Sequence, residues 1–136
     1  MRIEAQIATT ALIVKDKSFL VIKRATQDEI GKEGSWTLPG GRVEAYEDPN
    51  KSVLREVKEE TGLNVKLIKP ILVWSIRKDD VWRIVIHYLC EYKKGKVKLS
   101  KEHSDFAWIK FKDLKKVKLD KWIKENAKIV MKELKI

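Results

Sequence analysis

Three glutamates at helical spacing are the residues of this sequence best placed to do chemistry. Glu56, Glu59 and Glu60 stand at positions i, i+3 and i+4, so a helix would project their side chains from one face. Carboxylates this close repel one another by about a few tenths of a kcal/mol per pair, which favours a bound cation. Mg²⁺ is the usual hard cation with oxygen ligands where phosphates complete its shell. The alternative is an exposed acidic face paired with Lys51 or Lys58.

The acidic residues belong to a longer pattern that runs from Gly41 to Leu63, GRVEAYEDPNKSVLREVKEETGL. This stretch resembles the Nudix box of the Nudix hydrolase superfamily, G-x5-E-x7-R-E-U-x-E-E-x-G-U, in which U is an aliphatic residue. The defined positions are all filled at the right spacing, by Gly41, Glu47, Arg55, Glu56, Val57, Glu59, Glu60, Gly62 and Leu63. Two other segments extend the resemblance: Trp36–Gly40 is similar to the usual lead-in, and Val21–Arg24 to the second strand of MutT-like members.

The resemblance implies a metal site and hydrolytic chemistry. Glu59 and Glu60 would be metal ligands, and the backbone carbonyl of Gly40 would be a third. Glu56 matches a position that binds metal in some members and acts as general base in others. The implied cofactor is Mg²⁺, with Mn²⁺ as an alternative. The implied reaction is metal-assisted attack of water on a phosphorus atom.

Other box positions would support this chemistry. Arg55 would complete the catalytic set with the three glutamates and would orient Glu56, while Glu47 would brace the loop through Arg55. Tyr46 departs from many members, which have glycine just before the first glutamate of the box, so the loop conformation is expected to differ. Glu44 is open to two interpretations, a part of the metal shell or a solvated loop charge.

Outside the box, Arg24 and Glu102 are further candidates, whereas the two histidines are not. Arg24 could contact substrate phosphates, as its counterpart does in MutT-like enzymes; a surface ion pair is the alternative. Glu102 lies where relatives often carry a catalytic or metal-binding glutamate on a mobile loop, so it is a candidate base, ligand or substrate contact; a loop charge is the alternative. His103 is interpreted as a hydrogen-bonding loop residue, and His87, inside an apolar strand, as a core or sheet-face residue.

Aromatic residues offer a second kind of contact. Trp36, Trp74 and Trp82 are expected to lie mostly in the core. One of them, or Tyr46, could instead stack on a nucleobase, and the sequence does not distinguish between these residues.

Two helices are predicted. Asp48 followed by Pro49 is a strong helix start, and Gly62 is well placed to end the helix after Thr61, so the box glutamates lie on a helix over 49–61. Apolar residues at three- and four-residue steps predict an amphipathic helix at the C-terminus, namely Leu119, Ile123, Ala127, Val130 or Met131, and Leu134.

Strand patterns surround these helices. Strands are predicted at 8–14, 19–23, 65–76, 82–92 and 105–110, with turns at 16–17 and 78–80, a loop at 25–36 and irregular backbone at 38–41. The order of elements indicates a mixed α/β layered domain. Together with the resemblance, it predicts a Nudix-type α/β/α sandwich with a curved mixed sheet between the helices, as one domain over residues 1–136.

Composition limits the functional classes. No segment is apolar enough for a membrane span, and the start of the chain does not resemble a secretory signal. The single Cys90 cannot form an internal disulfide, so a cytoplasmic location is expected. The formal net charge of +10 fits either attraction of polyanions or a lysine-rich surface. Because the lysines do not form one compact block, the second interpretation is favoured, and nucleic acid is not specifically indicated.

Several functions share the box chemistry. The favoured one is a MutT-like pyrophosphohydrolase that cleaves a phosphoanhydride bond of a (d)NTP. The first alternative is hydrolysis of ADP-ribose or another nucleotide sugar. The second is a non-catalytic domain that binds nucleotide or RNA, which the intact acidic positions argue against. The expected partner is a small nucleotide, and monomer and homodimer both stay open.

Overall fold

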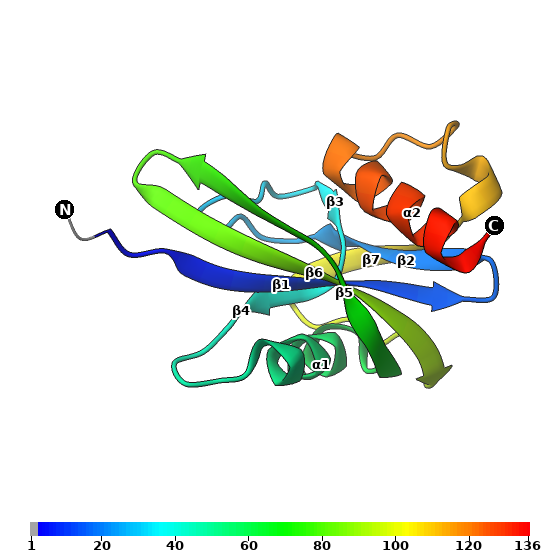
Figure 1. Cartoon of the computed structure of the whole chain (residues 1–136), viewed down its shortest axis with the longest axis horizontal. Helices are drawn as coiled ribbons and strands as arrows, with labels where there is room; N and C mark the ends of the chain where they lie inside the picture. Colours follow the sequence, from blue (N-terminus) through cyan, green and yellow to red (C-terminus); the bar gives the residue numbers. More distant parts are fainter. Residues whose placement is uncertain (1–2) are drawn as a thin grey trace.

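The computed structural model describes residues 3–136 and contains a seven-stranded mixed sheet (Figure 1). The strands are β1 (Gln6–Lys15), β2 (Ser18–Arg24), β3 (Trp36–Thr37), β4 (Gly40–Arg42), β5 (Asn64–Lys78), β6 (Val81–Lys94) and β7 (His103–Lys110). The main path through the sheet is β3-β2-β1-β6-β5, with β4 paired to β1 and β7 paired to β2. β1 and β6 run in parallel, and the other pairings in the described chain are antiparallel.

Two helices cover opposite faces of this sheet (Figure 1). They are α1 (Pro49–Thr61) and α2 (Lys121–Leu134). Because side chains alternate along a strand, β1 contributes to both layers. Leu12 packs with Ile123 on the α2 side, and Ile13 packs with Val57 on the α1 side. The predicted α/β/α sandwich with a mixed sheet is therefore confirmed. No helix within residues 3–136 is long and apolar enough to cross a membrane.

Helix α1 begins and ends where the sequence predicts, because both of its ends are capped. The Asp48 side chain accepts a hydrogen bond from the Asn50 N–H at 2.8 Å, and Pro49 occupies the first helical position. At the other end Gly62 adopts a φ of 73°, the left-handed conformation that closes many helices. These caps fix which residues face the sheet and which face the cleft described below.

The predicted strands all form, and each is somewhat longer than predicted. Irregular backbone was predicted at 38–41, but the end of this segment is regular. Gly40–Arg42 pairs with β1 as the short strand β4. A Cβ atom on Gly40 would overlap the Thr9 carbonyl oxygen and would lie 2.8 Å from Thr10 Cα. Glycine is therefore needed here so that the backbone can approach β1 closely.

The loop before α1 explains the unusual residue in the box. Tyr46 has a φ of 64°, its side chain is fully exposed, and the Glu47 N–H closes a turn on the Glu44 carbonyl at 3.0 Å. The position at which many family members carry glycine is thus one that needs left-handed backbone. A tyrosine adopts it at a cost of about 1 kcal/mol.

We expect Tyr46→Gly to raise the free energy of unfolding by about 0.5–1 kcal/mol, since relief of backbone strain outweighs the added chain entropy of glycine. Urea denaturation measures this change. Tyr46→Ala is the matched control, because it removes the same exposed ring without relieving the strain. Equal effects of the two substitutions would contradict the explanation.

Candidate active site and metal centre

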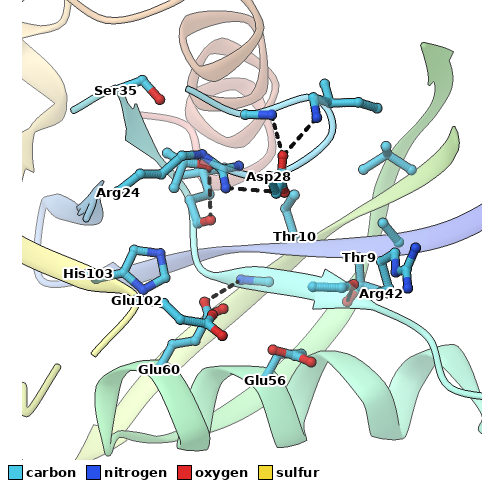
Figure 2. A pocket seen from close by; sticks show the side chains of 18 of the residues that line it. Thr9, Thr10, Arg24, Asp28, Ser35, Arg42, Glu56, Glu60, Glu102 and His103 are labelled. Carbon is cyan, nitrogen blue, oxygen red and sulfur yellow. Dashed lines mark hydrogen bonds and ion pairs between the residues drawn. The ribbon is translucent and has the colours of Figure 1, made fainter. Parts of the chain in front are cut away.

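A cleft of about 1340 Å³ opens beside α1 and the start of α2. It is lined by nearly all of the predicted site residues: Arg24, Gly40, Arg55, Glu56, Glu59, Glu60 and Glu102. Glu47 is outside the lining and reaches it through Arg55. Glu56 and Glu60 project from α1 on one side of the cleft, and Arg24 and Asp28 lie on the other (Figure 2).

Arg55 is the cation at the centre of the box. Its Nε and Nη2 atoms donate to the two carboxylate oxygens of Glu47 at 2.7 and 2.9 Å. Its Nη1 donates to Glu56 at 2.8 Å and to Glu59 at 3.2 Å. The bidentate contact lowers the pKa of Glu47 to about 2 and raises that of Arg55. The contact between Glu47 and Arg55 is the one expected to brace the loop. Glu44 is mostly exposed and lies 3.8 Å from Arg55, at the edge of this group of charges.

Glu60 is a buried carboxylate that no cation in the described chain pairs with. It is 6% exposed and accepts a hydrogen bond from the Gly40 N–H at 3.0 Å. Burial raises its pKa to about 8, helped by the nearby charges of Glu56 and Glu102 and opposed by the Gly40 hydrogen bond. Burial also raises the pKa of Glu56, although Arg55 opposes it. Both carboxyl groups lie where a bound cation would favour their charged forms.

The segment that carries Glu102 is docked against the end of α1. The Lys98 N–H donates to the Thr61 carbonyl at 2.8 Å, and the Ser100 N–H donates to the Glu60 carbonyl at 3.2 Å. These contacts satisfy carbonyls that a helix end leaves without intrahelical partners. The Glu102 carbonyl then accepts from the Ala25 N–H at 2.8 Å, which ties the segment to the end of β2. Glu102 is thereby held beside α1.

The docking brings Glu102 and His103 to Glu60. Within residues 3–136 these three form the one group of at least three His, Cys, Asp or Glu side chains whose ligand atoms all lie within 4.8 Å of one another. The carboxylates of Glu56 and Glu59 are turned toward Arg55 instead. A divalent cation fits this donor set, because it would neutralise two adjacent carboxylates, one of them buried without an ion pair.

His103 was interpreted as a hydrogen-bonding loop residue, but the structure places it in a strand and buries it. It begins β7, is buried at 9% exposure, and its Nδ1 has no hydrogen-bond partner among the described residues. Burial lowers its pKa to about 4, with Arg24 contributing, so the ring is neutral near pH 7. In the sequence His103 is marked only by the adjacent candidate Glu102, because Glu60, its other neighbour in the site, lies far away along the chain.

Arg24 lies across the cleft from α1. Its Nη1 is 3.5 Å from a carboxylate oxygen of Asp28, whose other oxygen accepts from the backbone N–H groups of Ile30 and Gly31. A register shift between Lys23 and Arg24 marks a bulge in the β2–β7 ladder, a device that redirects side chains. Arg24 therefore forms the ion pair that was one of its two interpretations and also lines the cleft, and its contact with substrate phosphates stays a prediction.

Another part of the cleft wall is aromatic. His87 is buried between Trp74 and Trp122, with ring centroids 5.6 and 5.7 Å away, and its Nδ1 is 2.6 Å from Thr10 Oγ1. Burial lowers the pKa of His87 to about 4, so the ring is neutral. Trp74 lines the cleft and is only partly buried, whereas it was expected mostly in the core. The sequence does not distinguish Trp122, because the residues around it have the apolar spacing of an ordinary amphipathic helix.

Comparison with known proteins agrees with this geometry. The family model described as NUDIX domain matches residues 5–132. Proteins named nucleoside triphosphatase NudI, from Escherichia coli O139:H28 and Shigella sonnei, are 32% identical over 76% of this chain and 80% of their own length. The MutT protein from Methanosarcina mazei Go1 superposes with a TM-score of 0.84 at 27% identity, over 100% of this chain and 99% of that one. An ADP-ribose pyrophosphatase from Streptococcus suis 89-1591 shares the fold at 21% identity, with a TM-score of 0.68 over 92% of this chain and 86% of that one.

We expect Gly41→Ala to displace the Glu56 carboxylate while the fold is kept. A Cβ on Gly41 would lie 2.5 Å from Glu56 Cδ, and the Gly41 backbone is not left-handed, so the clash falls on one flexible side chain. The free energy of unfolding should drop by about 1 kcal/mol, the low end for overpacking. A crystal structure and urea denaturation measure the two effects.

The matched control is the same substitution in a Glu56→Ala background, where the clash no longer exists. There Gly41→Ala should change stability by less than about 0.5 kcal/mol. An unmoved Glu56 side chain, or equal destabilisation in both backgrounds, would show that this contact does not constrain position 41.

Proposed function

Since this chain belongs to the Nudix hydrolase family and so acts on phosphorus-containing acid anhydrides, we propose that it is a Mg²⁺-dependent nucleoside triphosphate pyrophosphohydrolase. The products would be a nucleoside monophosphate and pyrophosphate. The observation that carries this proposal is a single cleft lined both by the acidic cluster and by the rings of Trp74 and Trp122. Such a cleft can accept the phosphates at one part of its wall and a base at another. The NudI relatives, named as nucleoside triphosphatases, support the same substrate class.

The residues that would hold the metal are three glutamates of the box and Gly40, which directly precedes it. Glu56, Glu59 and Glu60 supply carboxylate oxygens, and the Gly40 carbonyl supplies a neutral one, a donor set suited to Mg²⁺ or Mn²⁺. When bound, the ion lowers the pKa of a water molecule and neutralises charge that builds on phosphate oxygens. Arg55 holds Glu56 and Glu59 against this part of the cleft and is itself held by Glu47.

Glu56 is proposed as the residue that takes the proton from the attacking water, or as a metal ligand beside it. Its partial burial raises its pKa, which brings a carboxylate closer to the range useful for a general base. Arg24 can leave Asp28 for a substrate phosphate, because their contact is long at 3.5 Å and partly exposed. Glu102, which directly precedes β7, places a second carboxylate beside Glu60.

A substrate panel tests the proposal. Purified protein is incubated with each dNTP and NTP, ADP-ribose, a UDP-sugar, a dinucleoside polyphosphate and capped RNA, with Mg²⁺ or Mn²⁺. We expect the highest kcat/KM for a (d)NTP, with pyrophosphate rather than orthophosphate released. Preference for ADP-ribose or the UDP-sugar would transfer the assignment to nucleotide sugars. No turnover of any compound, with nucleotide binding retained, would favour the non-catalytic alternative.

The proposed roles of Glu56 and Glu47 predict opposite effects on stability. Glu56→Gln should lower kcat by at least about 10²-fold, the low end for loss of a general base. Its melting temperature at pH 7 should stay or rise, because a raised pKa means that the charged form destabilises the fold. Activity assays with saturating Mg²⁺ and thermal melting measure both effects.

Glu47→Gln is the matched comparison on the same arginine. The lowered pKa of Glu47 means that its charge stabilises the fold above its unfolded pKa near 4.5, and that this is lost as pH falls toward about 2. The melting temperature at pH 7 should therefore fall, and kcat should drop less than in Glu56→Gln. Near wild-type turnover in Glu56→Gln would show that the roles are assigned wrongly.

A further inference from the structure

His103 presents an unexplained buried nitrogen at the metal centre. The side chain is nine-tenths buried, and its Nδ1 has no hydrogen-bond partner among the described residues. A buried polar atom without a partner costs on the order of 1–3 kcal/mol, so each such atom calls for an explanation, of which a bound ion is one. The ring faces the carboxylates of Glu60 and Glu102, not the apolar core (Figure 2).

The geometry around His103 is that of a ligand set. A ring nitrogen of His103 and one carboxylate oxygen each from Glu60 and Glu102 lie within 4.8 Å of one another. Ligand atoms that share one transition-metal ion, with bonds of about 2.1 Å, stand no more than about 4.2 Å apart. A small movement of the exposed Glu102 side chain is enough to close this difference.

The backbone around the three residues holds them in place before any ion binds. Glu60 is fixed by the Gly40 N–H at 3.0 Å, and His103 by the Ser100 carbonyl, which accepts its backbone N–H at 3.2 Å. Arg24, the nearest cation across the cleft, is directed to Asp28 at 3.5 Å. Neither carboxylate therefore forms an ion pair within residues 3–136, and Arg24 lowers the pKa of Glu60 only as a minor contribution from a distance.

We propose that Glu60, Glu102 and His103 form a transition-metal site, with His103 as its nitrogen ligand. The site shares one ligand, Glu60, with the all-oxygen Mg²⁺ site of the proposed function. The proposal depends on the proposed function only through this shared ligand. Neutral imidazole favours first-row transition metals, in the order Mn²⁺ < Co²⁺ < Ni²⁺, whereas Mg²⁺ is bound through oxygen. His103 therefore biases this centre toward Mn²⁺ or Co²⁺ over Mg²⁺.

Pulsed electron paramagnetic resonance of the Mn²⁺-loaded full chain tests the nitrogen ligand directly. The chain has two histidines, His87 and His103, so a directly bound ¹⁴N can be assigned by substitution. We expect ¹⁴N coupling in the wild type and in His87→Gln, and its loss in His103→Gln. By isothermal titration calorimetry, His103→Gln should weaken Mn²⁺ binding at least about tenfold and Mg²⁺ binding less than about threefold.

Several outcomes would overturn the proposal. These are an absence of ¹⁴N coupling in the wild type, coupling that persists in His103→Gln, or an equal loss of Mn²⁺ and Mg²⁺ affinity. If His103→Gln does not fold, Glu102→Gln replaces it, because that side chain is exposed; it should weaken Mn²⁺ binding at least about tenfold, and unchanged binding would refute the site. A ¹⁴N coupling without nucleotide hydrolysis would refute the proposed function alone, and hydrolysis without coupling would refute this site alone.

Discussion

The guanidinium of Arg55 makes the acidic cluster of α1 compatible with a folded chain. It donates to Glu47, Glu56 and Glu59 from one planar group, and its carboxylate partners come from the loop and from the helix. Without such a cation, carboxylates one helical turn apart would repel one another. The same contacts hold the loop before α1, so the position of Glu56 and the conformation of that loop depend on a single side chain.

Glu60 lies outside the reach of this cation, and that difference divides the site into two parts. Arg55 compensates the charges of Glu56 and Glu59, whereas Glu60 forms no ion pair among the described residues, and burial raises its pKa to about 8 despite the Gly40 N–H and the charge of Arg24. Its protein surroundings therefore favour the protonated carboxyl near neutral pH. A divalent cation reverses this preference, so binding of metal and loss of a proton from Glu60 are expected to be linked. The electrostatic imbalance is local and arises from burial more than from the number of charges.

Local rules explain why α1 could be predicted from the sequence and why the complete centre could not. Asp48, Pro49 and Gly62 determine the ends of the helix through contacts within a few residues, and the i, i+3, i+4 spacing fixes which side chains share a face. His103 reaches Glu60 only because Lys98 and Ser100 hydrogen-bond to the final carbonyls of α1. These contacts join segments far apart in sequence. The left-handed backbone at Tyr46 was likewise hidden, because the residue there is not glycine.

The parallel pairing of β1 with β6 builds the aromatic part of the cleft wall from residues outside the box. It places Thr10 opposite His87 in the ladder, and the short contact of their side chains fixes the imidazole between Trp74 and Trp122. None of these residues comes from α1 or the loop before it, so they can change without disturbing the Arg55 contacts. The family to which the chain belongs accounts for hydrolysis of a phosphorus-containing anhydride, and under the proposed function the strands and α2 would receive the base of the substrate. A complete box motif therefore identifies the chemistry and leaves the nucleotide open, because the aromatic part of the cleft wall lies outside the box.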